Sequence, residues 1–254
     1  MSALPGTTGR RRIYLMRHGH VDYFGREIQA AKGDTKVVPL TPLGQEQAKA
    51  GGAALAHVRF DRAVCSGVPR TIGTANFVLD AQTPDLRPAL EIVPDLIEIH
   101  GGGFVKAKSR TELAAEMAFY FEQAAEPNAT MLEGGEVFTE AEKRAVGAIR
   151  KLLAEPGWST MLIAAHEGIN RLILGWAALG AKGSGLQAVR AFEQDPACIN
   201  VIDFDMVPKA DGSLGTEIER AIIKSVNVTP YNYMKHGANM TSLEAIFART
   251  PASN

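Results

Sequence analysis

Hydrophobic and polar positions divide the chain into short apolar runs that alternate with amphipathic segments. Two runs, 13–16 and 161–165, are continuously apolar, which is typical of strands covered on both faces. We predict further strands or extended segments over 60–65, 90–99, 198–204 and 217–225. Helices are predicted over 41–57, 69–79, 111–125, 136–154 and 169–179. Strands that alternate with helices in this way indicate an α/β protein with a mostly parallel sheet.

Glycine, proline and capping residues set the boundaries of these segments. Thr41 followed by Pro42 is a good helix start, because threonine caps and proline suits the first helical position. The glycine run 101–103 reads as a hinge, after which the composition changes. We predict a single domain over 1–254, with a flexible leader over 1–11, an inserted cap over about 101–132 and a C-terminal tail over 226–254.

Composition and charge narrow the class of protein. The chain has 254 residues, of which 46% are hydrophobic and 22% charged, as in an ordinary globular protein. Its net charge of −1 gives no indication of nucleic acid or of an anionic membrane as a partner. The longest apolar stretch, 172–181, is far short of the roughly 20 residues that a membrane span needs.

Cysteine content and the leader bear on the compartment. Cys65 and Cys198 are the only cysteines, so a disulfide framework is not expected, and both read as small core residues. The leader ends in three arginines, 10–12, which we interpret as solvating a tail, and it contains no apolar segment of signal-peptide length. We expect a cytoplasmic protein; a homodimer remains open.

Polar residues that could bind a ligand or take part in catalysis follow three predicted strands. Arg17 and His18 end the first strand, Arg70 comes just after the second, and His166 follows the run 161–165. Glu98 lies shortly before the glycine run. The carboxyl ends of parallel strands meet at one edge of a sheet, where ligands bind, so we expect these side chains to lie together.

Two arginines, two histidines and one carboxylic acid suit the binding and cleavage of a phosphate monoester. Arginine binds phosphate bidentately and does not titrate. A neutral His18 would be the nucleophile, and Arg17 and Arg70 would oppose its protonation. His166 would add donors to the phosphoryl oxygens, and Glu98 would protonate the leaving alcohol and then activate water. This chemistry needs no metal or other cofactor, and the expected partner is a small phosphate ester.

The order of these motifs resembles the histidine phosphatase superfamily, the phosphoglycerate mutase-like branch 1. The matching segments are Arg17-His18-Gly19, Leu40-Thr41-Pro42-Leu43-Gly44, Ser66 through Arg70 with Thr74-Ala75, Leu96-Ile97-Glu98, Gly134-Gly135-Glu136 and His166. The resemblance implies a three-layer α/β/α sandwich. It also implies that His18 is phosphorylated, that Arg17, Arg70 and His166 hold the phosphate, and that Glu98 donates the proton.

The loop after the first histidine departs from the family pattern and is the expected place of substrate recognition. Val21 and Phe24 stand where a hydroxyl and an amide are common, which makes that side of the pocket less polar. We expect Gly19, His20 and Phe24 to lie at the substrate. Glu167 stands where a second glycine is usual, and its side chain is expected to point away from the phosphate while its backbone N–H serves the site.

A metal site is the main alternative from another class. His18, His20 and Asp22 form a His-x-His-x-Asp pattern that binuclear metallohydrolases use, and His166 would be a further ligand. Against this, Tyr23 stands where that pattern wants another histidine, and Arg17 would repel a dication.

Two further alternatives keep the phosphate pocket. One is a phosphate-binding module without turnover. The other is a phosphoglycerate mutase-type transfer, for which Lys106, Lys108 and Arg110 in the predicted cap would supply extra basic contacts.

Overall fold

A mixed six-stranded sheet forms the centre of the molecule. The computed structural model describes residues 9–23, 34–101 and 119–231. The strands lie in the order β3-β2-β4-β1-β5-β6. Their bounds are Gly9–Arg17 (β1), Arg62–Cys65 (β2), Leu90–Ile92 (β3), Thr160–Ala165 (β4), Ile199–Pro208 (β5) and Thr216–Val228 (β6). The first four strands are mutually parallel, whereas β5 runs antiparallel to both β1 and β6, so the prediction of a mostly parallel sheet is confirmed.

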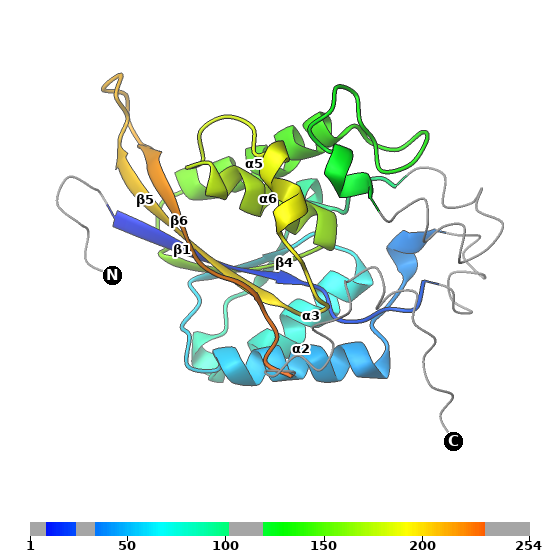
Figure 1. Ribbon diagram of the computed structural model, residues 1–254. Coiled ribbons are helices and arrows are strands. Elements are labelled where there is room, and N and C mark those ends of the chain that lie inside the picture. The colour runs from blue at the N-terminus through cyan, green and yellow to red at the C-terminus, as the bar shows by residue number, and fades with distance from the viewer. Residues whose placement is uncertain (1–8, 24–33, 102–118, 232–254) are drawn as a thin grey trace.

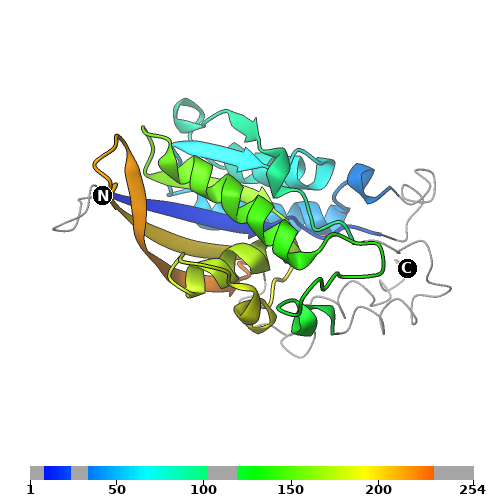
Figure 2. The ribbon, with the colours of Figure 1, turned by 90° about the horizontal axis from the view of Figure 1, so that it is seen from above.

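Helices cover both faces of the sheet and make the three predicted layers (Figure 1). The α-helices are Pro42–Leu55 (α2), Pro69–Asp80 (α3), Phe138–Ala154 (α5) and Glu167–Ala178 (α6). Helices α2 and α3 lie on one face, and α5 and α6 on the other, which Figure 2 views from the side that α5 covers. Short 3-10 helices span Thr35–Val37, Pro84–Leu86, Pro94–Leu96, Tyr120–Gln123 and Leu186–Ala191.

Side chains along β1 alternate between the two faces of the sheet, so this strand contributes to a hydrophobic core on each face. Ile13 and Leu15 are fully buried in the cluster beneath α5 and α6. Met16 is buried on the other face, where the half-buried Tyr14 also packs. Successive strand residues point to opposite faces, so a continuous apolar run is required when both faces are covered.

Four segments differ from the sequence-based predictions in their bounds or in their type. The leader was expected to reach residue 11, but β1 begins at Gly9, because Arg10 and Arg12 pair with aspartates on β5. The segment 90–99 is a strand only over Leu90–Ile92, since Pro94 starts a 3-10 helix. Helix α5 begins at Phe138, two residues later than expected. Within the described part of the predicted helix 111–125, the chain forms a 3-10 helix that ends at Gln123.

Several predicted features lie partly or wholly outside the described residues. These are most of the leader, most of the cap, the tail beyond Tyr231, Phe24, Lys106, Lys108 and Arg110. The described end of the cap buries Phe121 and Leu132 in the same cluster as α5 and α6, so this part adds to the main core. In the described residues, no helix is long and apolar enough to cross a membrane.

Candidate active site

Three neighbouring strands bring the predicted residues to one edge of the sheet. Strand β4 lies between β2 and β1, so the residues that follow these strands are neighbours in space. Arg17 and His18 end β1, and His166 ends β4 as the cap of α6. Arg70 lies in the first turn of α3, which follows β2. All four are buried, with exposed fractions of 3% or less.

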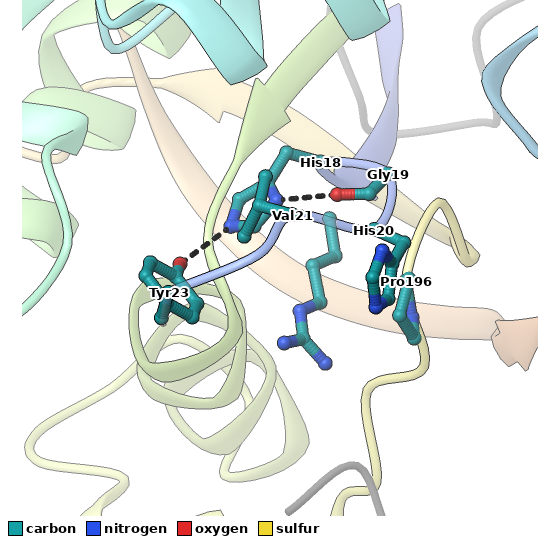
Figure 3. Close-up of a pocket in the computed structure, with 7 residues that line it drawn as sticks. His18, Gly19, His20, Val21, Tyr23 and Pro196 are labelled. Carbon is teal, nitrogen blue, oxygen red and sulfur yellow. Dashed lines mark hydrogen bonds between the residues drawn. The ribbon is translucent and has the colours of Figure 1, made fainter. Parts of the chain in front are cut away.

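One ring nitrogen of His18 is hydrogen-bonded to the backbone. Its Nδ1 lies 2.8 Å from the carbonyl oxygen of Gly19, so Nδ1–H donates there and Nε2 carries the lone pair (Figure 3). Burial first, and then Arg70, His166 and Arg17, lower the pKa of His18 well below its usual range. The imidazole is therefore neutral, and Nε2 is a nucleophile.

Gly19 is required by packing as well as by the site. A Cβ at Gly19 would collide with the backbone of Gly44 in the first turn of α2, and a Cβ at Gly44 would collide with His20. The N–H of Gly19 donates to the hydroxyl of Thr74, at 3.1 Å. The loop after the nucleophile thus lies directly against α2, and the glycine of each motif permits this contact.

Three buried nitrogen atoms at this edge have no hydrogen-bond partner within the described chain: Arg17 Nε, Arg70 Nε and His166 Nδ1. A buried polar group without a partner costs about 1–3 kcal/mol, and such groups are rare in native proteins. Guanidinium and imidazole groups are the kinds of donor that a phosphate dianion needs. Arg17, Arg70 and His166 thus lie buried close enough to His18 to act on its charge, as the sequence predicted.

Ser66 is a residue of this site to which the sequence pattern assigned no role. Its hydroxyl lies 2.8 Å from Nε2 of His166 and 3.0 Å from the hydroxyl of Thr71. When Ser66 donates to Nε2, the ring proton is on Nδ1, which is the nitrogen without a partner. Burial, together with Arg70 and Arg17, lowers the pKa of His166 well below its usual range, so the neutral ring is the resting form. The place of Ser66 at a strand end was the available signal.

The carboxylate of Glu98 is hydrogen-bonded to the backbone at the start of α6. Its carboxylate accepts from the backbone N–H groups of Ile99 at 2.9 Å and of Gly168 and Ile169 at 3.2 Å. A Cβ on Gly168 would lie 2.8 Å from Oε1 of Glu98, so the glycine after Glu167 is what admits this carboxylate. Burial raises the pKa of Glu98 despite these three donors. A carboxyl group of this kind can hold a proton closer to neutrality.

The side chain of Glu167 is paired with two arginines, and the expectation that it points away from a bound phosphate stays a prediction. Its Oε2 lies 3.2 Å from Nη1 of Arg17, and its Oε1 lies 3.0 Å from Nη2 of Arg171. A buried carboxylate needs paired cations, and two guanidinium groups provide them. Arg17 therefore meets a carboxylate through one nitrogen while its Nε is left without a partner.

The loop residues beyond Gly19 differ in their contacts. His20 and Tyr23 both line the pocket, together with Val21 and Pro196 (Figure 3). The ring of His20 lies 2.9 Å from the hydroxyl of Thr41. The hydroxyl of Tyr23 lies 3.5 Å from Nε2 of His18, a contact that sequence reasoning missed. Phe24 lies outside the described residues.

The metal alternative finds no support in this geometry. The described residues contain no group of three or more histidine, cysteine, aspartate or glutamate side chains that could hold a metal ion. His20 turns to Thr41, and Asp22 is exposed. The three residues of the His-x-His-x-Asp pattern therefore do not converge on one point.

Comparison with known proteins identifies the family. Residues 13–207 match the model of the histidine phosphatase superfamily (branch 1), and the chain belongs to this superfamily. The family and the class of enzyme predicted from the sequence, a phosphoric monoester hydrolase, are thereby confirmed.

The sequence identity between this chain and individual relatives is low. The chain is 27% identical over 163 residues to an adenosylcobalamin/alpha-ribazole phosphatase of Salmonella typhimurium, a match that covers 64% of this chain and 77% of the relative. It is 39% identical over 72 residues to a 2,3-bisphosphoglycerate-dependent phosphoglycerate mutase of Treponema pallidum, which is 28% of each protein. The crystal structure of the alpha-ribazole phosphatase from Shigella flexneri superposes with a TM-score of 0.60 at 25% identity, covering 85% of this chain and 96% of that one.

Proposed function

We propose that the protein hydrolyses a phosphate monoester without a metal ion, through a phosphohistidine intermediate on Nε2 of His18. The observation that carries this proposal is the lone pair on Nε2 of His18, which the hydroxyl of Tyr23 approaches only to 3.5 Å, together with the buried and unpartnered Nε atoms of Arg17 and Arg70. The guanidinium groups supply the positive charge that a metal would otherwise bring to the phosphoryl group.

The reaction would proceed in two displacements. In the first, Nε2 of His18 attacks phosphorus, the ester P–O bond breaks, and Glu98 gives its proton to the leaving alcohol. In the second, water attacks the phosphohistidine, Glu98 takes a proton from that water, and His18 is released. Burial lowers the pKa of His18 and raises that of Glu98. Both groups are then in their required forms on the acid-to-neutral side of the pH range.

The substrate class is proposed from the relatives. Alpha-ribazole phosphate is the first ester to test, because relatives named as phosphatases of it match most of the chain. A mutase-type transfer is the second candidate, favoured by the shorter match to a phosphoglycerate mutase. It shares the first displacement and differs in that the phosphoryl group passes to a second alcohol.

We also propose that the enzyme works in a reducing compartment such as the cytoplasm. Cys65 and Cys198 are free and buried in the structure, which is typical of proteins that keep reduced thiols. The homodimer that the sequence left open stays a prediction.

The test is a panel of phosphate esters, including alpha-ribazole phosphate and 2,3-bisphosphoglycerate, assayed with EDTA present. We expect turnover of at least one ester by the wild type and a loss of at least about 10⁴-fold in His18→Ala. Activity that disappears with EDTA and returns with a divalent cation would contradict the proposal.

The intermediate is tested separately. Rapid acid-free quenching of the Glu98→Gln variant with labelled substrate should trap a phosphoenzyme that is stable to base and labile to acid. Transfer of the label to 3-phosphoglycerate rather than to water would favour the mutase. A phosphatase that forms no phosphoenzyme in this slowed variant would remove His18 from the mechanism.

A further inference from the structure

Tyr23 contacts the reacting atom of the proposed nucleophile. Its hydroxyl lies 3.5 Å from Nε2 of His18, at the outer limit of a hydrogen bond (Figure 3). Because Nδ1–H of His18 donates to the carbonyl of Gly19, Nε2 can only accept, and the phenol is the donor. In the free enzyme, the lone pair that must attack phosphorus is thus held by the hydroxyl of Tyr23.

The surroundings of Tyr23 keep its ring in place and its hydroxyl protonated. Tyr23 packs against a small cluster formed by Val21, Val38 and Leu40, which anchors the loop. The guanidinium of Arg70 lies over its ring, 5.9 Å from the centroid. Burial raises the pKa of Tyr23, although Arg70 and Arg17 act in the opposite sense. At neutral pH the phenol is therefore a fixed donor beside the phosphate pocket.

Attack on phosphorus frees this donor at the moment when charge develops nearby. Once Nε2 forms its bond to phosphorus, the hydroxyl has lost its acceptor. The phosphoryl oxygens attached to that phosphorus are then the closest new acceptors. A donor that is aimed at charge formed in the transition state, and not at the ground state, is the kind of group that increases kcat.

We propose that Tyr23 is a catalytic residue, whose hydroxyl passes from Nε2 of His18 to a phosphoryl oxygen as the phosphohistidine forms. The proposal rests on the proposed phosphatase mechanism. Tyr23 keeps its proton throughout: the P–O ester bond breaks, the P–N bond forms, the alcohol takes its proton from Glu98, and only the acceptor of the phenol changes.

The sequence of the loop gives this assignment a second support. Val21 and Phe24 are apolar at positions where the family often has polar side chains, so the loop was expected to offer less to a phosphate. Val21 is indeed buried in the apolar cluster. The hydroxyl of Tyr23 enters the pocket from this same loop and supplies a donor that Val21 cannot.

The test compares Tyr23→Phe with the matched control Tyr14→Phe. Both remove one phenolic hydroxyl, but Tyr14 lies on β1 with its ring edge-on to Phe60, away from the pocket. We expect Tyr23→Phe to lower kcat about 10- to 100-fold and to weaken binding of orthovanadate, a mimic of the transition state, by a similar factor. Binding of inorganic phosphate should weaken less than about threefold, and Tyr14→Phe should change none of these values.

Two results would overturn the assignment. One is a Tyr23→Phe enzyme whose kcat and vanadate affinity stay within about twofold of the wild type. The other is an equal loss of vanadate and phosphate affinity, which would mean that Tyr23 acts only on the ground state of the pocket. If Tyr23→Phe does not fold, Tyr23→Leu, which also lacks the hydroxyl, must show the same split between the two anions.

The outcome is separable from that of the proposed function. Affinities for vanadate and phosphate are measured by calorimetry and need no turnover. A wild type without phosphatase activity would refute the proposed function, while the ratio of the two affinities would still decide the role of Tyr23. An active wild type with an unaffected Tyr23→Phe variant would refute the role of Tyr23 alone.

Discussion

The two ends of β1 carry arginines that are paired to different degrees. At its start, Arg12 lies directly opposite Asp203 of β5 and makes two hydrogen bonds to it, of 2.6 and 2.8 Å. Arg10 makes the equivalent pair with Asp205, at 2.7 and 3.1 Å. At its end, Arg17 meets Glu167 through a single nitrogen, and its buried Nε has no partner in the described chain.

This difference separates an arginine that holds the sheet together from one that is available to a ligand. Two nitrogens of Arg12, Nε and Nη2, are matched by both oxygens of a fully buried carboxylate, so this face of its guanidinium is occupied. Arg17 and Arg70 each retain a buried donor at the edge where the nucleophile lies. Incomplete pairing of this kind is disfavoured in the folded protein and is offset when an anion binds.

The largest expected effect is on activity, from a change at the open end. Arg70→Ala should lower kcat/KM by about 10²–10³-fold, because a donor to the phosphoryl group is lost. The free energy of unfolding should change by less than about 1 kcal/mol, since the lost bond from Arg70 to Thr35 is offset by removal of a buried donor without a partner. Steady-state kinetics and denaturant unfolding measure the two values. A large loss of stability with normal kinetics would make Arg70 a structural residue.

The paired end should show the opposite behaviour. Arg12→Ala leaves the buried Asp203 with Arg10, at 3.6 Å, as its remaining cation among the described residues, and should lower the free energy of unfolding by about 2 kcal/mol. The value of kcat/KM per folded molecule should stay within about twofold of the wild type. If Arg12→Ala impairs catalysis as much as Arg70→Ala does, the distinction between the two ends of β1 is wrong.

The open end should also make the protein sensitive to acid. Burial lowers the pKa of both His18 and His166. Below about pH 6.5 these two histidines are therefore protonated in the unfolded chain but still neutral in the folded protein. Stability should therefore be complete above pH 6.5 and fall as the pH decreases, by about 1.4 kcal/mol per pH unit for each histidine.

The variant His166→Gln tests this pH dependence. It should reduce the slope of unfolding free energy against pH between 6.5 and 5 by about one histidine's share. The control for the loss of a histidine is His57→Gln, because the side chain of His57 is exposed next to the end of α2. Equal slopes in the wild type and in His166→Gln would show that His166 does not oppose protonation in the fold.

The smallest effect is expected at the third arginine of the paired end. Arg220 of β6 also binds Asp205, at 2.6 Å, but its side chain is 53% exposed and Arg10 already holds the same carboxylate. Arg220→Ala should lower the free energy of unfolding by about 0.5 kcal/mol, measured by denaturant titration. A loss of stability as large as that from Arg12→Ala would mean that the exposed Arg220 contributes as much to the free energy of unfolding as the paired Arg12 does.

Much of the fold and of the site could be predicted because the signals were local. The apolar runs predicted β1 and β4, and Thr41-Pro42 predicted the start of α2, where the Thr41 hydroxyl accepts from the N–H of Gly44. The position of polar residues after parallel strands predicted that His18 and His166 would meet, and their rings lie 5.2 Å apart. Element ends were less accurate, as with the strand that Pro94 cuts short.

Contacts between distant segments could not be predicted in the same way. Arg10 and Arg12 were interpreted as part of a solvated tail because their aspartate partners lie more than 190 residues later in the chain. The ion pair of Glu167 with Arg17 joins residues that follow two different strands, and no local pattern predicts it. The contact of Tyr23 with His18 depends on the path of a loop that follows no periodic pattern.

The sequence by itself determined the order of strands and helices, the family, and the proposed roles of His18, Arg70 and His166, because periodicity and short motifs are properties of neighbouring residues. The tertiary structure decided the state of those residues. It placed the proton of His18 on Nδ1, raised the pKa of Glu98 by burial, paired Arg12 with both oxygens of Asp203 and left the buried Nε atoms of Arg17 and Arg70 without a partner in the described chain. Desolvation and hydrogen bonding depend on what surrounds a group in space, and only the folded chain specifies those surroundings.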